Sequence, residues 1–212
     1  MKPTSSAFTV LAAASCFTAC LGDFVVTFII GYFYRGYDFI NQSESYLGVS
    51  ASPVAIYMKI WSVVFSLLFV VYAYALKRNI FAKGVWQTWV VWLIAIYGLG
   101  EGIGSGLFPY DHDGHELTLS GKLHSVFSAI GDAALVVVPF ILLKIFPKTV
   151  YPKLNRYIRL VAFSGPVIII MFLLARQNLL PVKGLWQRIY LLDYYLLLVS
   201  LSVYMVIVHF RS

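Results

Sequence analysis

Long apolar segments separated by short polar stretches repeat along the whole chain. Each has about the 20 residues that an α-helix needs to cross a bilayer. No alternation of apolar and polar residues typical of strands accompanies them. The pattern therefore predicts an all-α, polytopic membrane protein with six transmembrane helices in a single domain over residues 1–212. The helices are expected at 8–33, 53–76, 85–108, 119–145, 158–175 and 187–209.

The start of the first segment resembles a signal peptide. Met1-Lys2 precedes Ala12-Ala-Ala-Ser-Cys16, which offers the small residues of a cleavage site, even that of a lipoprotein. The apolar run nevertheless continues past Cys20 to Tyr32, which is too long for a signal-peptide core. We therefore expect an uncleaved first helix.

Composition supports the membrane assignment. The chain is 60% hydrophobic and 12% charged, and a soluble domain of 212 residues could not bury so much apolar surface. The formal charge of +7 comes from residues in short loops between the apolar segments, so it indicates topology, and we predict no nucleic-acid partner. Two cysteines, Cys16 and Cys20, lie in the first segment and predict no disulfide framework.

The placement of Lys and Arg predicts the orientation. With a cytoplasmic N-terminus, the inner segments hold ten basic residues and no acidic one. The outer segments hold five basic residues, balanced by five acidic ones. Basic residues concentrate in cytoplasmic loops. We therefore expect both the N-terminus and the C-terminus to be cytoplasmic, in a multi-pass protein of the cell membrane.

The most unusual stretch carries Glu101 into the third apolar segment. Glycines at positions 98, 100, 102, 104 and 106 surround it and allow a neighbouring helix or a ligand to approach the backbone. An ionisable residue at membrane depth is costly and commonly marks a functional site. Two interpretations stay open: close helix packing with Glu101 in a structural ion pair, or a functional pocket.

Titratable side chains within the apolar segments are unevenly distributed with depth. At a rise of about 1.5 Å per residue, four of them lie roughly 8–10 Å below the outer surface and two lie about 13–20 Å below it. The inner half of the membrane holds almost none. This asymmetry predicts a polar pocket that opens outward. The shallow set is Lys59, Glu101, His124 and Asp193, and the deeper set is Asp23 and Asp132.

Helical spacing suggests which side chains share the pocket. Ser120, His124, Ser128 and Asp132 recur every four residues and should lie on one helix face. His124 suits a satisfied interfacial histidine, a proton-transfer group or a metal ligand, and these alternatives stay open. As the lone cation among acidic and imidazole groups, Lys59 is expected to pair with a carboxylate.

A second cluster lies between the third and fourth segments. Asp111, His112, Asp113, His115 and Glu116 include residue types that bind divalent metals. Their spacing matches no diagnostic metal motif, so we expect a solvated loop. The sequence assigns no metal site and no cofactor.

Short motifs are distributed over most of the chain, namely Ser45-Tyr-Leu-Gly48 with Ser52-Pro53, Gly106-Leu-Phe-Pro109 and Gly121-Lys-Leu-His124. With these motifs the chain resembles an uncharacterised six-helix membrane family, domain of unknown function 998. The resemblance implies a six-helix integral membrane fold and brings no established activity.

The favoured hypothesis is a pocket that binds a lipid headgroup or a small polar molecule, in a protein whose partners include membrane lipids. In its hydrolase or transferase form, His124 acts as general acid/base, and Glu101 and Asp193 orient it or the substrate. The substrate would contact Lys59, Asp23, Asp132 and Ser128. One alternative is a proton-coupled transporter in which Asp23 and Asp132 carry the proton. Another is a structural or assembly protein without catalysis.

Overall fold

The computed structural model describes residues 6–81 and 83–211. Within them, six helices are long and apolar enough to cross a membrane, which confirms the predicted fold class. They are α1 (Ser6–Phe33), α2 (Ala55–Arg78), α3 (Val85–Tyr97) with its continuation through η2 (Gly98–Gly104) and α4 (Ser105–Leu107), α5 (Leu119–Ile145), α6 (Pro152–Arg176) and α7 (Lys183–Arg211).

Two helices, α6 and α7, begin about a turn or more earlier than the apolar pattern predicts. α6 begins at Pro152 and α7 at Lys183, because their polar and basic first turns continue the helix beyond its apolar part. Proline suits this position in α6, since the first turn of a helix does not need its N–H. In α5, the Thr118 side chain caps the first turn by accepting a hydrogen bond from the Gly121 N–H at 3.1 Å.

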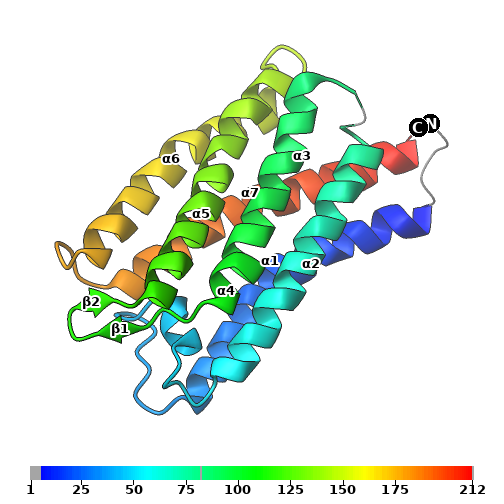
Figure 1. The fold of residues 1–212 in the computed structure, drawn as a ribbon. Coiled ribbons are helices and arrows are strands. Elements are labelled where there is room, and N and C mark those ends of the chain that lie inside the picture. Colours follow the sequence, from blue (N-terminus) through cyan, green and yellow to red (C-terminus); the bar gives the residue numbers. More distant parts are fainter. Residues whose placement is uncertain (1–5, 82, 212) are drawn as a thin grey trace.

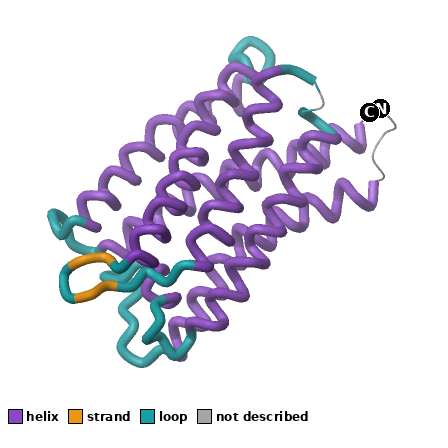
Figure 2. Tube along the Cα trace, viewed as in Figure 1, coloured by secondary structure: helices purple, strands orange, loops and turns teal. Residues whose placement is uncertain are grey.

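The helices form a ring. Helices that follow one another in the chain pack together, and α7 packs against α1 to close the circle (Figures 1 and 2). The ring is filled by buried apolar and aromatic side chains. Across it, the Tyr72 hydroxyl of α2 donates to the Leu198 carbonyl of α7 at 2.9 Å.

The two ends of the ring differ. The start of α1 and the end of α7 lie at one end (Figure 1). The opposite end carries the 3₁₀-helix η1 (Glu44–Gly48) and a small hairpin of β1 (His112–Asp113) and β2 (Glu116–Leu117). The hairpin pairs His112 with Leu117 in antiparallel register. These connections cover the end that holds the candidate site.

The segment that the sequence predicts as a solvated loop forms this hairpin. Its turn uses Gly114, whose φ of +61° is accessible to glycine without strain. The hairpin is tied to the loop before α2, because Asp111 Oδ1 accepts a hydrogen bond from the Ser50 N–H at 2.8 Å. Its strand residues His112, Asp113 and Glu116 are exposed.

Candidate functional site

Glycines let the third membrane-spanning segment pack closely on both sides. The backbone forms a π-helical turn over Gly98–Gly104, a distortion that is frequent at functional sites. On one side, a Cβ at Gly100 would lie 2.9 Å from the Phe127 carbonyl oxygen and 3.0 Å from the Gly131 Cα of α5. On the other side, Gly102 packs against α2. Residues 98–106, here called the glycine segment, therefore pack tightly between α2 and α5.

A serine of α2 holds the π turn. Ser66 Oγ donates to the Gly98 carbonyl at 2.5 Å and accepts from the Ile103 N–H at 2.7 Å. These two backbone groups are five residues apart, the spacing of a π-helical pair, so the hydroxyl satisfies polar groups within the membrane. The turn aims Glu101 towards α5, where Glu101 Oε1 accepts a hydrogen bond from Ser128 Oγ at 2.6 Å.

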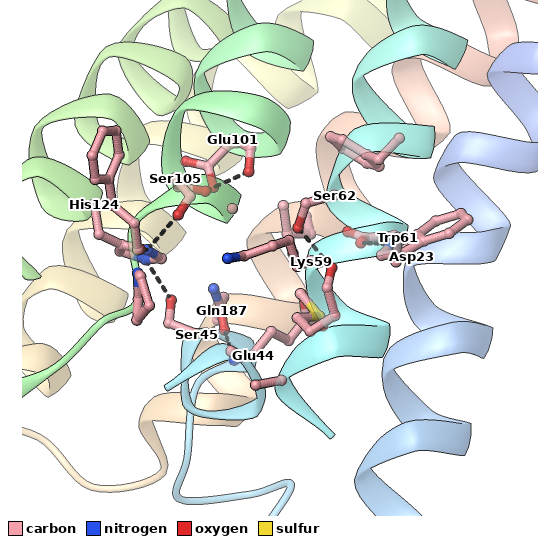
Figure 3. Close-up of a pocket in the computed structure, with 18 of the residues that line it drawn as sticks. Asp23, Glu44, Ser45, Lys59, Trp61, Ser62, Glu101, Ser105, His124 and Gln187 are labelled. Atoms are coloured by element: carbon pink, nitrogen blue, oxygen red, sulfur yellow. Dashed lines mark hydrogen bonds between the residues drawn. The ribbon is translucent and has the colours of Figure 1, made fainter. Parts of the chain in front are cut away.

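Beside Glu101 lies a cavity of about 280 Å³ (Figure 3). Side chains of α1, η1, α2, α5 and α7 line it, together with the segment through η2 and α4. It reaches the surface next to the start of α2, where the lining residues Ser50, Ile56 and Lys59 are exposed. Its charged and imidazole lining residues are Asp23, Glu44, Lys59, Glu101 and His124.

Aromatic rings close the deep end of the cavity. Phe65 and Tyr97 line it, and the fully buried Phe69 packs behind them, with ring centroids 4.8 Å from Phe65 and 5.2 Å from Tyr97. Asp23 lies at this depth. Its carboxylate accepts hydrogen bonds from Trp61 Nε1 at 3.0 Å and Tyr195 Oη at 2.6 Å. Asp23 is thus a buried, hydrogen-bonded part of the cavity lining.

Lys59 extends from α2 towards the side of the cavity that holds Glu101 and His124 (Figure 3). Within residues 6–81 and 83–211, the one salt bridge joins Arg188 to Glu44. The prediction that Lys59 pairs with Glu101 or Asp193 is therefore wrong. Equal depth along helix axes does not bring side chains within 4 Å when the helices form the wall of a cavity. The ammonium group of Lys59 therefore makes no ion pair within the described residues.

Glu44, in η1, is a buried part of the cavity lining. Its Oε1 is 3.8 Å from Arg188 Nε, and Thr27 Oγ1 donates to it at 3.4 Å. Burial raises the pKa of Glu44 to about 8, and the Asp23 carboxylate adds to the rise, while Arg188 and Thr27 oppose it. The Glu44 N–H donates to Gln187 Oε1 at 2.7 Å. These contacts fix η1 against α1 and α7.

His124 lies on the opposite wall, near the start of α5. Its Nδ1 lies 3.0 Å from the Ser105 carbonyl oxygen and 2.9 Å from that of Phe108. Its Nε2 lies 3.1 Å from Ser45 Oγ of η1. The imidazole therefore joins the glycine segment, α5 and η1 at one point of the cavity wall.

Two of the predicted site residues lie away from the cavity lining. Asp193 accepts a hydrogen bond from Ser164 Oγ of α6 at 2.7 Å, which contradicts its expected place beside Glu101 and His124. α7 directs the buried side chains of Tyr190, Tyr194 and Leu197 into the interior. Its 3.6-residue period therefore turns position 193 towards α6. Depth alone could not reveal this rotation.

Asp132 accepts a hydrogen bond from Tyr190 Oη at 3.1 Å and is absent from the cavity lining. Eight residues turn an α-helix by about 800°, which is about 80° more than two full turns. Asp132 therefore lies about 80° around the helix from His124. Ser128 meets Glu101, and Asp132 turns further away. The two aspartates of the transport hypothesis thus occupy separate surroundings.

Sequence reasoning missed three contributors to the site: Glu44, Ser45 and Gln187. Glu44 and Ser45 belong to a loop between two apolar segments, where polar residues are ordinary. Ser45 opens the motif that carries the family resemblance, which was the available signal. Gln187 lies on the inward face of α7, but its side chain is uncharged, so the pattern of titratable residues does not identify it.

Comparisons with known proteins identify the family of the chain. Neither the curated proteins nor the solved structures contain a match to the chain. A family model described as a protein of unknown function, DUF998, matches residues 6–204. Because that match covers well over half of the chain, the protein, with its six helices apolar enough to cross a membrane, belongs to the DUF998 family.

Proposed function

We propose that this protein binds the polar headgroup of a membrane lipid in the cavity between α2, the glycine segment and α5, and that it does so in the cell membrane. The observation that carries the proposal is the Lys59 ammonium group, which lines the cavity and makes no ion pair within the described residues. A charged amine in such a place is matched by an anionic group of a ligand.

The carboxylates of the cavity define the rest of the ligand. Glu101 uses Oε1 to accept from Ser128, and Oε2 makes no hydrogen bond to the described residues. A free carboxylate oxygen accepts hydrogen bonds from a hydroxyl or an ammonium group. The fitting ligand therefore combines an anionic group for Lys59 with hydroxyl or ammonium donors for Glu101, as glycerol phosphate and ethanolamine phosphate headgroups do.

The position of the opening favours a lipid over a free solute. Exposed apolar side chains flank it, with Ile56 59% and Ile60 56% exposed on α2 and Leu107 48% exposed on α4. In a membrane such side chains face acyl chains. A headgroup can enter beside them while its acyl chains remain in the bilayer. A soluble molecule with the same headgroup chemistry is the competing source.

Native mass spectrometry of the purified full-length protein tests the proposal. The probes are dioleoyl lipids with glycerol phosphate, ethanolamine phosphate or choline phosphate headgroups, and soluble glycerol 3-phosphate. We expect retention of the first two lipids, weaker retention of the choline lipid, which has no donor, and no retention of the soluble compound. Preferential retention of glycerol 3-phosphate would instead identify a solute site.

The matched variants are Lys59→Gln and Lys122→Gln. Lys122 is exposed near the start of α5, outside the cavity lining, and serves as the control. A charge-assisted hydrogen bond contributes about 1.5–3 kcal/mol, so Lys59→Gln should weaken retention about 10- to 100-fold. Equal retention by wild type and Lys59→Gln would show that Lys59 only extends to the membrane surface, and would refute the proposal.

A further inference from the structure

A hydroxyl and an imidazole from distant parts of the chain meet on the cavity wall. Ser45 Oγ, in η1, lies 3.1 Å from His124 Nε2, in α5 (Figure 3). Both residues line the cavity. The distance lies within the range of about 2.6–3.2 Å that joins a nucleophile to its base in enzymes that use covalent catalysis.

The neighbours of the imidazole fix its tautomer. Nδ1 faces the carbonyl oxygens of Ser105 and Phe108, and these can only accept hydrogen bonds. The proton of neutral His124 therefore resides on Nδ1, and Nε2 presents a lone pair to the Ser45 hydroxyl. The carbonyl dipoles also stabilise the imidazolium that forms when Nε2 takes up a proton. In this site they perform the orienting task that a carboxylate has in a catalytic triad.

We propose that Ser45 is a nucleophile, activated by His124, which cleaves an ester bond of a lipid held in the cavity. This inference rests on the proposed headgroup site and names the reaction carried out there. It uses the expected general acid/base role of His124 and replaces the expected orienting role of Asp193 with that of the two backbone carbonyls.

The reaction is an acyl transfer to water. Ser45 Oγ attacks the ester carbonyl carbon while Nε2 of His124 takes the hydroxyl proton. The bond from the carbonyl carbon to the alkoxy oxygen then breaks, and the imidazolium gives the proton to the departing alcohol. A water molecule then gives a proton to Nε2 of His124 and attacks the carbonyl carbon of the acyl-serine. The bond from that carbon to Ser45 Oγ breaks and a carboxylic acid is released, while the imidazolium returns its proton to Ser45 Oγ and restores the hydroxyl.

Two donors are available for the oxyanion of the intermediates. Gln187 uses Oε1 to accept from the Glu44 N–H, which directs its amide NH₂ towards the interior of the cavity near Ser45 and Lys59 (Figure 3). Lys59 supplies a second donor from α2. Donors preorganised around a developing oxyanion supply much of the rate enhancement in acyl transfer. Gln187 and Lys59 thus complete the groups that the chemistry requires.

The apolar lining suits an acyl chain. Ile56, Met58 and Phe65 of α2 share the cavity with the polar groups. When the acyl chain of an ester contacts these residues and its anionic headgroup contacts Lys59, the ester carbonyl lies between chain and headgroup, on the side of Ser45. The substrate class is therefore the carboxylic ester of a lipid with an anionic headgroup.

The test uses the purified full-length protein, a biotinylated fluorophosphonate, and dioleoyl lipid with a glycerol phosphate headgroup. We expect a covalent adduct located on Ser45 by mass spectrometry, and release of oleate from the lipid. Ser45→Ala should abolish both signals, and His124→Gln should lower both rates by about 10²–10⁴-fold, the usual contribution of a general base. A wild-type protein that is unlabelled and releases no oleate would overturn the inference.

Ser200→Ala is the matched control. Ser200 lies in α7 outside the cavity lining, and its hydroxyl donates to the Leu196 carbonyl of its own helix at 2.8 Å. This variant should retain labelling and oleate release. Labelling of Ser45→Ala at the wild-type rate would overturn the assignment of Ser45 as the nucleophile. Labelling of Ser45 without oleate release would overturn the lipid ester as the substrate.

A second variant separates catalysis from a structural clamp. Ser45→Cys keeps a nucleophile beside His124, and the native Cys16 and Cys20 are buried. Iodoacetamide should therefore modify position 45 selectively, and more slowly once His124→Gln is added; equal rates would refute activation by His124. Lipid retention distinguishes the two proposals: an unlabelled wild type that retains the lipid refutes the esterase and leaves the headgroup site standing.

Discussion

Replacement of Gly100 by alanine tests how the glycine segment is built. The added Cβ would lie 2.9 Å from the Phe127 carbonyl oxygen and 3.0 Å from the Gly131 Cα. Ordinary contacts of a Cβ begin near 3.4 Å, so α5 would have to move away by about 0.5 Å. Both obstacles are backbone, which no change of rotamer can relieve.

The magnitude follows from two opposing effects. Overpacking of a close-packed interior costs about 1–3 kcal/mol. Alanine recovers up to about 1 kcal/mol, because glycine is the weaker helix former. Because both obstacles are backbone, the upper half of the overpacking range applies, about 2–3 kcal/mol, and after the alanine gain of about 1 kcal/mol the expected net loss is about 1–2 kcal/mol. For a chain of this size each kcal/mol shifts the melting temperature by about 2–4 °C, so Gly100→Ala should melt roughly 2–8 °C lower.

Thermal unfolding in detergent micelles, followed by circular dichroism, measures the shift. Gly48→Ala is the control, because a Cβ at Gly48 would meet only Met58 Cγ at 3.5 Å, an ordinary contact. Its stability should stay within about 0.5 kcal/mol of the wild type. If Gly100→Ala melts at or above the wild-type temperature, the close contact between the glycine segment and α5 does not constrain the fold, and the packing argument fails.

Three further predictions concern charge. Because the pKa of Glu44 is about 8 in the folded protein and lower when unfolded, its contribution to stability is present at low pH and lost as pH rises through about 8. The melting temperature of the wild type should therefore fall relative to that of Glu44→Gln between pH 5 and 9, and parallel curves would contradict the burial argument. Lys59→Met should leave the melting temperature unchanged or higher while weakening headgroup retention by at least about 10-fold, because Lys59 makes no ion pair within the described residues; a clear loss of stability would show a structural role. In intact cells, a membrane-impermeant maleimide should modify Glu116→Cys but not Lys148→Cys, since the distribution of basic residues predicts a cytoplasmic 148; the reverse pattern would invert the topology.

The apolar pattern alone was sufficient to predict the six membrane helices. A membrane helix must satisfy its backbone hydrogen bonds internally and present about 20 apolar residues to lipid, so length and composition identify it without tertiary information. Glu101 was identified for a related reason: a carboxylate among apolar residues and glycines needs a protein partner. The structure supplies one in Ser128.

The rotation of each helix and the placement of the loops were decided by tertiary packing. Asp193 and Glu101 have similar predicted depths, yet Asp193 turns towards Ser164, because α7 directs its buried tyrosines inward. Sequence spacing fixes the relative angles of residues within one helix and leaves free the angle between that helix and its neighbours. Ser45 shows the same limit most clearly. It lies 79 positions from His124, and only the folding of η1 into the mouth of the ring brings its hydroxyl to the imidazole.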